Sequence, residues 1–184
     1  TNLKMDLKVI SRNLSSFYAA KIEKYRLSEN HIIDKMPFNL FWVGFLAISF
    51  PNAQFVHCKR DARATCWSNY ETSFAEGNQF SYKLNEIVRH YNNCEDLMLF
   101  WKSKFQDRIF TLDYDAFTEE PEIIGSSLFD FLQLSWKQEY LDGKRNDRPV
   151  KTASQLQVKR GIYRNSSQAW KNFEPFIGKA FQPL

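Results

Sequence analysis

The stretch QFVHCKRDARATCWSNY, residues 54–70, predicts a buried strand that ends on a cation and turns directly into a helix. Its first residues are rich in aromatic and β-branched side chains, Asp61 is a good N-cap, and no Gly or Pro interrupts the residues after the cap. Arg60 thus lies beside a helix N-terminus, whose unpaired N–H groups and dipole favour an anion. Ser68 falls on the helix face that begins at the cap. One oxyanion could therefore meet both Arg60 and Ser68.

Two further strands are predicted to end in similar positions. Residues 32–39 read IIDKMPFN, which predicts a short apolar strand near 31–35, with Pro37 opening the next helix. Lys35 then also falls at the carboxyl end of a strand. A third apolar run predicts a strand near 108–114. Open α/β sheets bind ligands outside the carboxyl ends of their strands, so these ends form the candidate site.

Hydrophobic periodicity predicts helices around these strands, in a single α/β domain of residues 1–184. At 43% hydrophobic and 16% aromatic residues, the chain can bury one sizeable core. The clearest helix lies near 83–104, where the apolar stripe indicates packing and not a cofactor site. Residues 142–151 are charged and carry Gly and Pro, which predicts an exposed loop. The other helices are predicted near 3–26, 38–49, 62–75, 121–133 and 136–141.

Four segments resemble, in order, the motifs of sulfotransferases that use 3′-phosphoadenosine 5′-phosphosulfate (PAPS), and are closest to the bacterial and tyrosylprotein-type branch. Arg60 followed by Ser68 is similar to the family's 3′-phosphate motif, within a PNA…HCKRD run that this branch often carries. DKMPFN is similar to a D-K-x-P-x-N strand end, and LDYDAF (112–117) to the R-Y-E-D-L strand end. VKTASQLQVKRGIY (150–163) resembles the segment that wraps the 3′-phosphate, with Gly161 where that branch usually has Pro.

The resemblance implies a P-loop NTPase-like α/β fold with a mostly parallel sheet flanked by helices. It implies sulfonate transfer from PAPS to a hydroxyl or amine acceptor, release of 3′-phosphoadenosine 5′-phosphate (PAP), and no metal. It places Lys35 against the 5′-phosphosulfate, where the ammonium steadies charge on the bridging oxygen, and Tyr114 on the adenine side. The residues that it implies for the 3′-phosphate are Arg60, Ser68, Ser154, Lys159 and Arg160.

One part of the family pattern is missing. Sulfotransferases begin with a strand, a glycine-containing loop and a helix whose backbone N–H groups hold the 5′-phosphosulfate. Here the first of six glycines is Gly44, and the first 30 residues read as helix. We therefore expect the chain to be incomplete at its amino end, about the carboxyl-terminal three-quarters of the family domain, and inactive by itself. Pro37 stands where the steroid and phenol branch has its catalytic His, and the tyrosylprotein branch takes its base from an upstream Glu, so no base is assigned.

The net charge of +4 conceals a basic carboxyl-terminal part. Residues 137–184 hold 10 Lys and Arg against 4 Asp and Glu, whereas residues 1–136 hold 15 against 17. A basic surface can bind nucleic acid, a membrane or a phosphorylated small molecule. Because the surplus overlaps the segment at 150–163, a nucleotide explains it without a nucleic-acid partner.

The cysteines and the hydropathy bear on metal binding and on the location of the protein. Cys58, Cys66 and Cys94 show no C-x-x-C spacing, so we expect buried thiols and no metal site. No run of 18 apolar residues occurs, so we expect no membrane span. The three cysteines and the lack of an amino-terminal hydrophobic run argue against a secreted disulfide framework, so we expect a cytoplasmic protein. Some of the many aromatic side chains could be buried against a second copy of the chain.

The sequence leaves three functions open. The first is a PAPS-dependent sulfotransferase domain acting on an unidentified acceptor. The second is a non-catalytic nucleotide- or partner-binding fragment of the same fold, favoured by the missing glycine loop. The third, a nucleic-acid-binding module, rests only on the basic tail.

Overall fold

The computed structural model describes residues 7–23, 31–74, 77–142, 162 and 166–184. The chain divides into two compact units that interleave in sequence. Unit 1 comprises Thr1–Phe55 and Leu97–Ile109, and unit 2 comprises Val56–Asp96 and Phe110–Leu184. A single domain over residues 1–184 stays a prediction.

Unit 1 is helical. Its elements are α1 (Leu7–Glu23), the 3₁₀ helix η1 (Pro37–Trp42), α2 (Val43–Ser49), the end of α4 (Leu84–Lys104) and η3 (Gln106–Arg108). Its core is built on Val43, Met98 and Ile109, which are all buried. Trp101 packs on Gly44, where an added Cβ would lie 2.7 Å from the indole ring, and its Nε1 donates to the Leu40 carbonyl at 2.8 Å. Glycine is therefore needed at position 44 for α4 to approach α2 this closely.

The strand predicted near 31–35 is wrong. Residues 31–36 have no regular secondary structure, and Ile32 and Ile33 are 50% and 92% exposed. A strand needs hydrogen bonds from a neighbouring strand, and the described sheet has only two strands, which pair with each other. Lys35 thus precedes η1 in an exposed segment without regular secondary structure.

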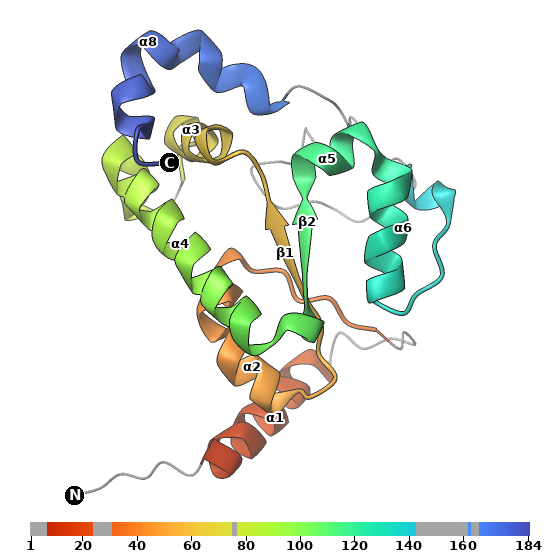
Figure 1. Ribbon diagram of the computed structural model, residues 1–184. Helices are drawn as coiled ribbons and strands as arrows, with labels where there is room; N and C mark the ends of the chain where they lie inside the picture. The colour runs from red at the N-terminus through yellow and green to blue at the C-terminus, as the bar shows by residue number, and fades with distance from the viewer. Residues whose placement is uncertain (1–6, 24–30, 75–76, 143–161, 163–165) are drawn as a thin grey trace, which may run out of the picture. The chain divides into compact units, whose positions relative to one another are not determined.

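Unit 2 contains the sheet. Strands β1 (Phe55–Lys59) and β2 (Ile109–Asp113) pair with each other and, apart from their first residues, belong to this unit. Figure 1 shows that the two strands run in the same direction, with α3 (Ala62–Glu71) following β1 and α5 (Tyr114–Glu119) following β2 at the same edge. The exposure of Cys58 contradicts the predicted buried strand, since alternate side chains of β1 reach solvent.

The rest of unit 2 is helical and closes around α3 and the first half of α4. Ile87 and Val88 of α4 are buried against Ala64 and Cys66 of α3, which confirms the predicted apolar stripe. The carboxyl-terminal segment completes this core with Trp170, Ile177 and Phe181. Its elements are η6 (Ser166–Phe173), α8 (Glu174–Ile177) and η7 (Gly178–Phe181); the remaining elements are η2 (Gln79–Tyr82), α6 (Pro121–Phe131) and η4 (Gln138–Leu141).

No helix within the described ranges combines the length and apolar character that crossing a bilayer requires.

Candidate functional site

The first component of the site is the junction between β1 and α3. Asp61 caps α3, because its side chain accepts a hydrogen bond from the Ala64 amide at 2.7 Å. This confirms the predicted cap. Arg60 directly precedes the cap, and its Nε donates to the Ser167 hydroxyl at 2.8 Å. The guanidinium therefore lies at the start of α3, where the helix dipole favours negative charge.

The second component is the corresponding junction between β2 and α5. Asp113 caps α5 by accepting hydrogen bonds from the Asp115 and Ala116 amides, both at 3.0 Å. The carboxylate of Asp115 then reaches α3: Oδ2 accepts from the Asp61 amide at 2.7 Å, and Oδ1 accepts from the Ser167 hydroxyl. The two strand ends and η6 are thus joined by one chain of hydrogen bonds.

A pocket of about 410 Å³ opens at this edge. Its lining residues are Lys59, Arg60, Asp61, Ala62, Tyr91, Glu95, Asp113, Asp115 and Leu184. Four carboxylates outnumber two cations, so net charge would not draw a phosphate in, and directed donors would have to hold it. Burial, followed by the nearby Glu95 carboxylate, raises the pKa of Tyr91 to about 12. The Tyr91 phenol therefore stays protonated at neutral pH.

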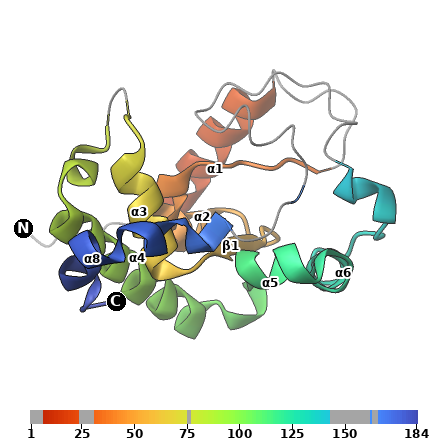
Figure 2. The same ribbon diagram turned by 90° about the horizontal axis from the view of Figure 1, so that it is seen from above.

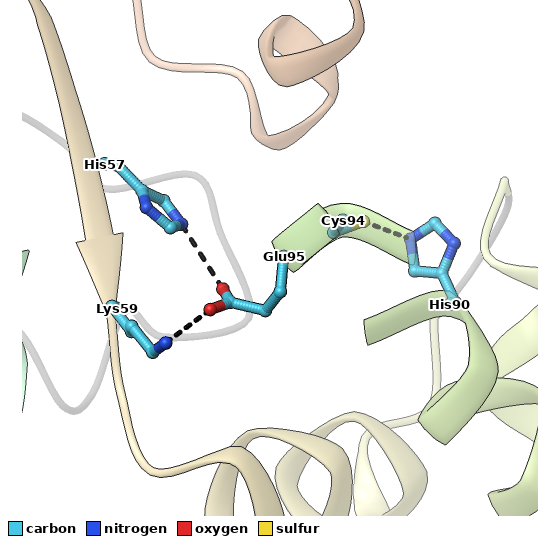
Figure 3. A network of polar contacts seen from close by, with 5 residues as sticks. All are labelled: His57, Lys59, His90, Cys94 and Glu95. Atoms are coloured by element: carbon cyan, nitrogen blue, oxygen red, sulfur yellow. Dashed lines mark hydrogen bonds and ion pairs between the residues drawn. The ribbon is translucent and has the colours of Figure 1, made fainter. Parts of the chain in front are cut away.

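Glu95 of α4 ties the pocket wall to β1. Figure 3 shows its carboxylate between Lys59, with which it forms an ion pair, and His57, whose Nε2 lies 3.6 Å from Oε1.

A cysteine and a histidine lie close together on the same helix. The Cys94 thiol, one residue before Glu95 on α4, lies 3.5 Å from His90 Nε2. Burial raises the pKa of Cys94 and lowers the pKa of His90, so both groups stay neutral. A neutral pair of this kind is not the activated thiolate that nucleophilic catalysis needs.

Comparison with known proteins identifies the family. A model of the sulfotransferase family matches residues 1–138 of this chain. The chain belongs to the sulfotransferase family. The sulfotransferase domain from the curacin biosynthetic pathway matches with a TM-score of 0.63 at 17% identity, over 86% of this chain and 60% of that one. This likeness shows the P-loop-like sulfotransferase fold that the sequence predicted.

Two relatives are similar in sequence over part of their length. An uncharacterized protein of Aquifex aeolicus (strain VF5) is 34% identical over 176 residues, which are 94% of this chain and 23% of the relative. Protein-tyrosine sulfotransferase 1 of Danio rerio is 25% identical over 135 residues, 72% of this chain and 38% of the relative. This sulfotransferase chain thus spans less than half the length of either relative.

Of the predicted site residues that the structure describes, one lies at the pocket. Arg60 lines the pocket. Ser68 is half-buried on α3, Tyr114 is half-buried as the first residue of α5, and neither is among the lining residues. Lys35 is exposed in unit 1. Ser154, Lys159 and Arg160 lie outside the described residues, and the roles of all these residues stay predictions.

Sequence reasoning missed several members of the site, among them Asp115 and Ser167. Asp115 was visible only as part of the LDYDAF strand end, and nothing in that motif indicated that its carboxylate would meet the start of α3. Ser167 lies 107 residues from Arg60 and carries no motif. No group of three or more possible metal ligands occurs among the residues that the structure describes.

Proposed function

We propose that this sulfotransferase chain belongs to an enzyme that transfers a sulfonate group from PAPS to a hydroxyl or amine acceptor. The observation that carries the proposal is the position of Arg60, at a strand end and beside the capped N-terminus of α3, in a chain of this family. Arg60 would hold the 3′-phosphate of the nucleotide, together with the hydroxyls of Ser68 and Ser154 and the cations of Lys159 and Arg160.

The donor set at this edge fits a phosphate. A guanidinium, backbone N–H groups at a helix start and hydroxyls are the donors that phosphate oxygens accept from. When bound, PAPS supplies an activated sulfonate on a good leaving group. Lys35 would stabilise the negative charge that develops on the bridging oxygen, and Tyr114 would contact the adenine side. The group that takes the acceptor's proton is not assigned.

We propose the acceptor only by its chemical class, a hydroxyl or an amine. The Danio rerio relative is named a protein-tyrosine sulfotransferase, so a phenolic hydroxyl on a protein is one member of the proposed class. A cytoplasmic location and self-association are further proposals, which rest on the cysteine pattern and the aromatic content of the sequence.

Calorimetric titration with PAP tests the proposal. Arg60→Ala should weaken binding by about 1.5–3 kcal/mol, the range for a charge-assisted hydrogen bond. Arg89→Ala is the matched control, because Arg89 is exposed on α4 and outside the pocket lining. Circular dichroism checks that both variants fold. Equal PAP affinity in Arg60→Ala and Arg89→Ala would remove Arg60 from the nucleotide site.

A non-catalytic nucleotide- or partner-binding role is the second candidate. For these 184 residues taken by themselves, it is favoured by the lack of any glycine before Gly44, because a glycine-containing loop for the 5′-phosphosulfate is then not among them. For these 184 residues alone we expect PAP binding without measurable sulfonate transfer. Turnover of about 1 s⁻¹ or faster, a rate typical of enzymes, would exclude the non-catalytic role.

A further inference from the structure

The N-terminus of α3 already holds an anion, and that anion belongs to the chain itself. Asp115 extends from the first turn of α5, where its side chain is half-buried, and its Oδ2 accepts a hydrogen bond from the Asp61 amide at 2.7 Å. Figure 1 shows why it can reach, since α3 and α5 start from the same edge of the sheet.

A second donor fixes the other oxygen of Asp115. Oδ1 accepts from the hydroxyl of Ser167, which is only 6% exposed. That hydroxyl accepts in turn from Arg60 Nε at 2.8 Å. The donors come from η6 and from the junction between β1 and α3, and Figure 2 shows the C-terminal segment running past α3 to the region of α5. Both carboxylate oxygens are thus held in a defined position.

The groups that hold Asp115 are of the kind that a phosphate oxygen uses. They are a backbone N–H at a helix N-terminus and a hydroxyl polarised by a guanidinium. A carboxylate and a phosphate that compete for one set of donors cannot both be satisfied, and two such anions in contact repel each other.

We propose that Asp115 is an internal competitor for the phosphate position of this site, and that it sets the affinity for 3′-phosphorylated nucleotides. This inference rests on the proposed function. A 3′-phosphate takes the donors of the Asp61 amide and the Arg60–Ser167 pair only when the carboxylate of Asp115 moves away. Affinity is therefore lower than the donors alone would give, and removal of Asp115 raises it.

The experiment compares wild type, Asp115→Ala and Asp115→Asn by calorimetry with PAP, adenosine 5′-monophosphate and inorganic phosphate. Asp115→Ala should bind PAP about tenfold or more tightly than wild type, the change expected when one charge-assisted hydrogen bond no longer has to be broken. Asp115→Asn keeps an acceptor without the charge and should fall between the two. Adenosine 5′-monophosphate lacks the 3′-phosphate, so its affinity should not change. Asp130→Asn, an exposed carboxylate on α6, controls for net charge.

A second measurement reports the displacement directly. The amide signal of Asp61 in a two-dimensional NMR spectrum should move when Asp115 is replaced by Ala and should move back when phosphate or PAP is added. This readout also covers a variant that is less stable without ligand, because added phosphate should then raise its melting temperature more than that of wild type.

The outcomes separate the two proposals. If no variant binds PAP but Asp115→Ala gains affinity for inorganic phosphate, the nucleotide function is wrong, and only the competition of Asp115 with a bound phosphate holds. If wild type and both variants bind PAP equally, the function holds and the competitor role is overturned. The competitor role is also overturned if Asp115→Ala gains affinity for neither PAP nor phosphate, or if the Asp61 amide does not respond to them.

Discussion

Arg108 should be among the residues on which the stability of unit 1 depends most. Its guanidinium is half-buried and donates four hydrogen bonds to three backbone carbonyls around the end of α2. Nη1 donates to Ala47 at 2.9 Å, Nη2 to Phe50 at 2.7 Å and to Ala53 at 2.8 Å, and Nε to Ala53 at 3.0 Å. Burial lowers the pKa of Arg108, as expected when desolvation opposes the charged form.

These hydrogen bonds determine how much stability is lost when Arg108 is replaced. A hydrogen bond to a charged group contributes about 1.5–3 kcal/mol, but two of the bonds share an acceptor and carbonyls at a helix end partly reach water. We therefore expect Arg108→Met to lower the free energy of unfolding by about 3–5 kcal/mol, near the upper end for single substitutions. Met keeps an unbranched apolar stem beside Phe55, over whose ring the guanidinium lies at 5.6 Å.

Urea unfolding, monitored by tryptophan fluorescence and by far-ultraviolet circular dichroism, measures this change. Arg89→Met makes the same substitution at an exposed position of α4 and should cost less than about 0.5 kcal/mol. Arg108→Lys keeps a cation but cannot present the planar fork, so its loss should lie between those of the other two variants. Free energies of unfolding for Arg108→Met and Arg89→Met that lie within about 1 kcal/mol of each other would contradict this role of Arg108.

Two further predictions concern Lys35 and the cysteines. In a catalytically active protein that contains this chain, Lys35→Ala should lower kcat about 100-fold or more and change PAP affinity less. The reason is that the Lys35 charge acts on the bridging oxygen, which becomes negative as its bond to the sulfonate breaks. An unchanged kcat with lost PAP affinity would make Lys35 a binding residue only. In native protein at about pH 8, a maleimide should modify exposed Cys58 rapidly and Cys66 hardly at all, as peptide mass spectrometry can show. Burial raises the pKa of Cys66 to about 12, which leaves about one thiolate in 10⁴ at that pH. Rapid labelling of Cys66 before unfolding would contradict its buried position.

Most of the features that the sequence predicted correctly have interactions that lie within a few residues; strands β1 and β2, which pair with each other, are exceptions. The cap at Asp61 joins two groups three residues apart, and the predicted helix near 83–104 became α4, Leu84–Lys104. The strand at Phe55–Lys59 was also placed correctly. Capping hydrogen bonds and a repeating apolar stripe are encoded in the local order of residues, so they can be read without the fold.

The prediction of a strand near 31–35 was wrong because a strand depends on residues far away in the sequence. Two apolar residues are enough to match a strand pattern, but their backbone N–H and C=O groups need hydrogen bonds from a neighbouring strand. Residues 31–35 have no such neighbour in the described sheet, and Ile33 is 92% exposed. Arg108 shows the same dependence on distant groups, since its carbonyl acceptors lie 55 to 61 residues earlier in the chain. No local pattern identified Arg108 as more than the start of an apolar run.

The candidate site also combines features set by neighbouring residues with features set by distant ones. The sequence by itself determined that Arg60 would stand at a strand end beside a helix N-terminus, because strand, cation and cap are consecutive. Only the tertiary structure decided that Asp115, 54 residues from Asp61, and Ser167, 107 residues from Arg60, meet there. Their hydrogen bonds depend on the pairing of β1 with β2 and on the packing of η6 against α3, and neither is specified by the residues nearby in sequence.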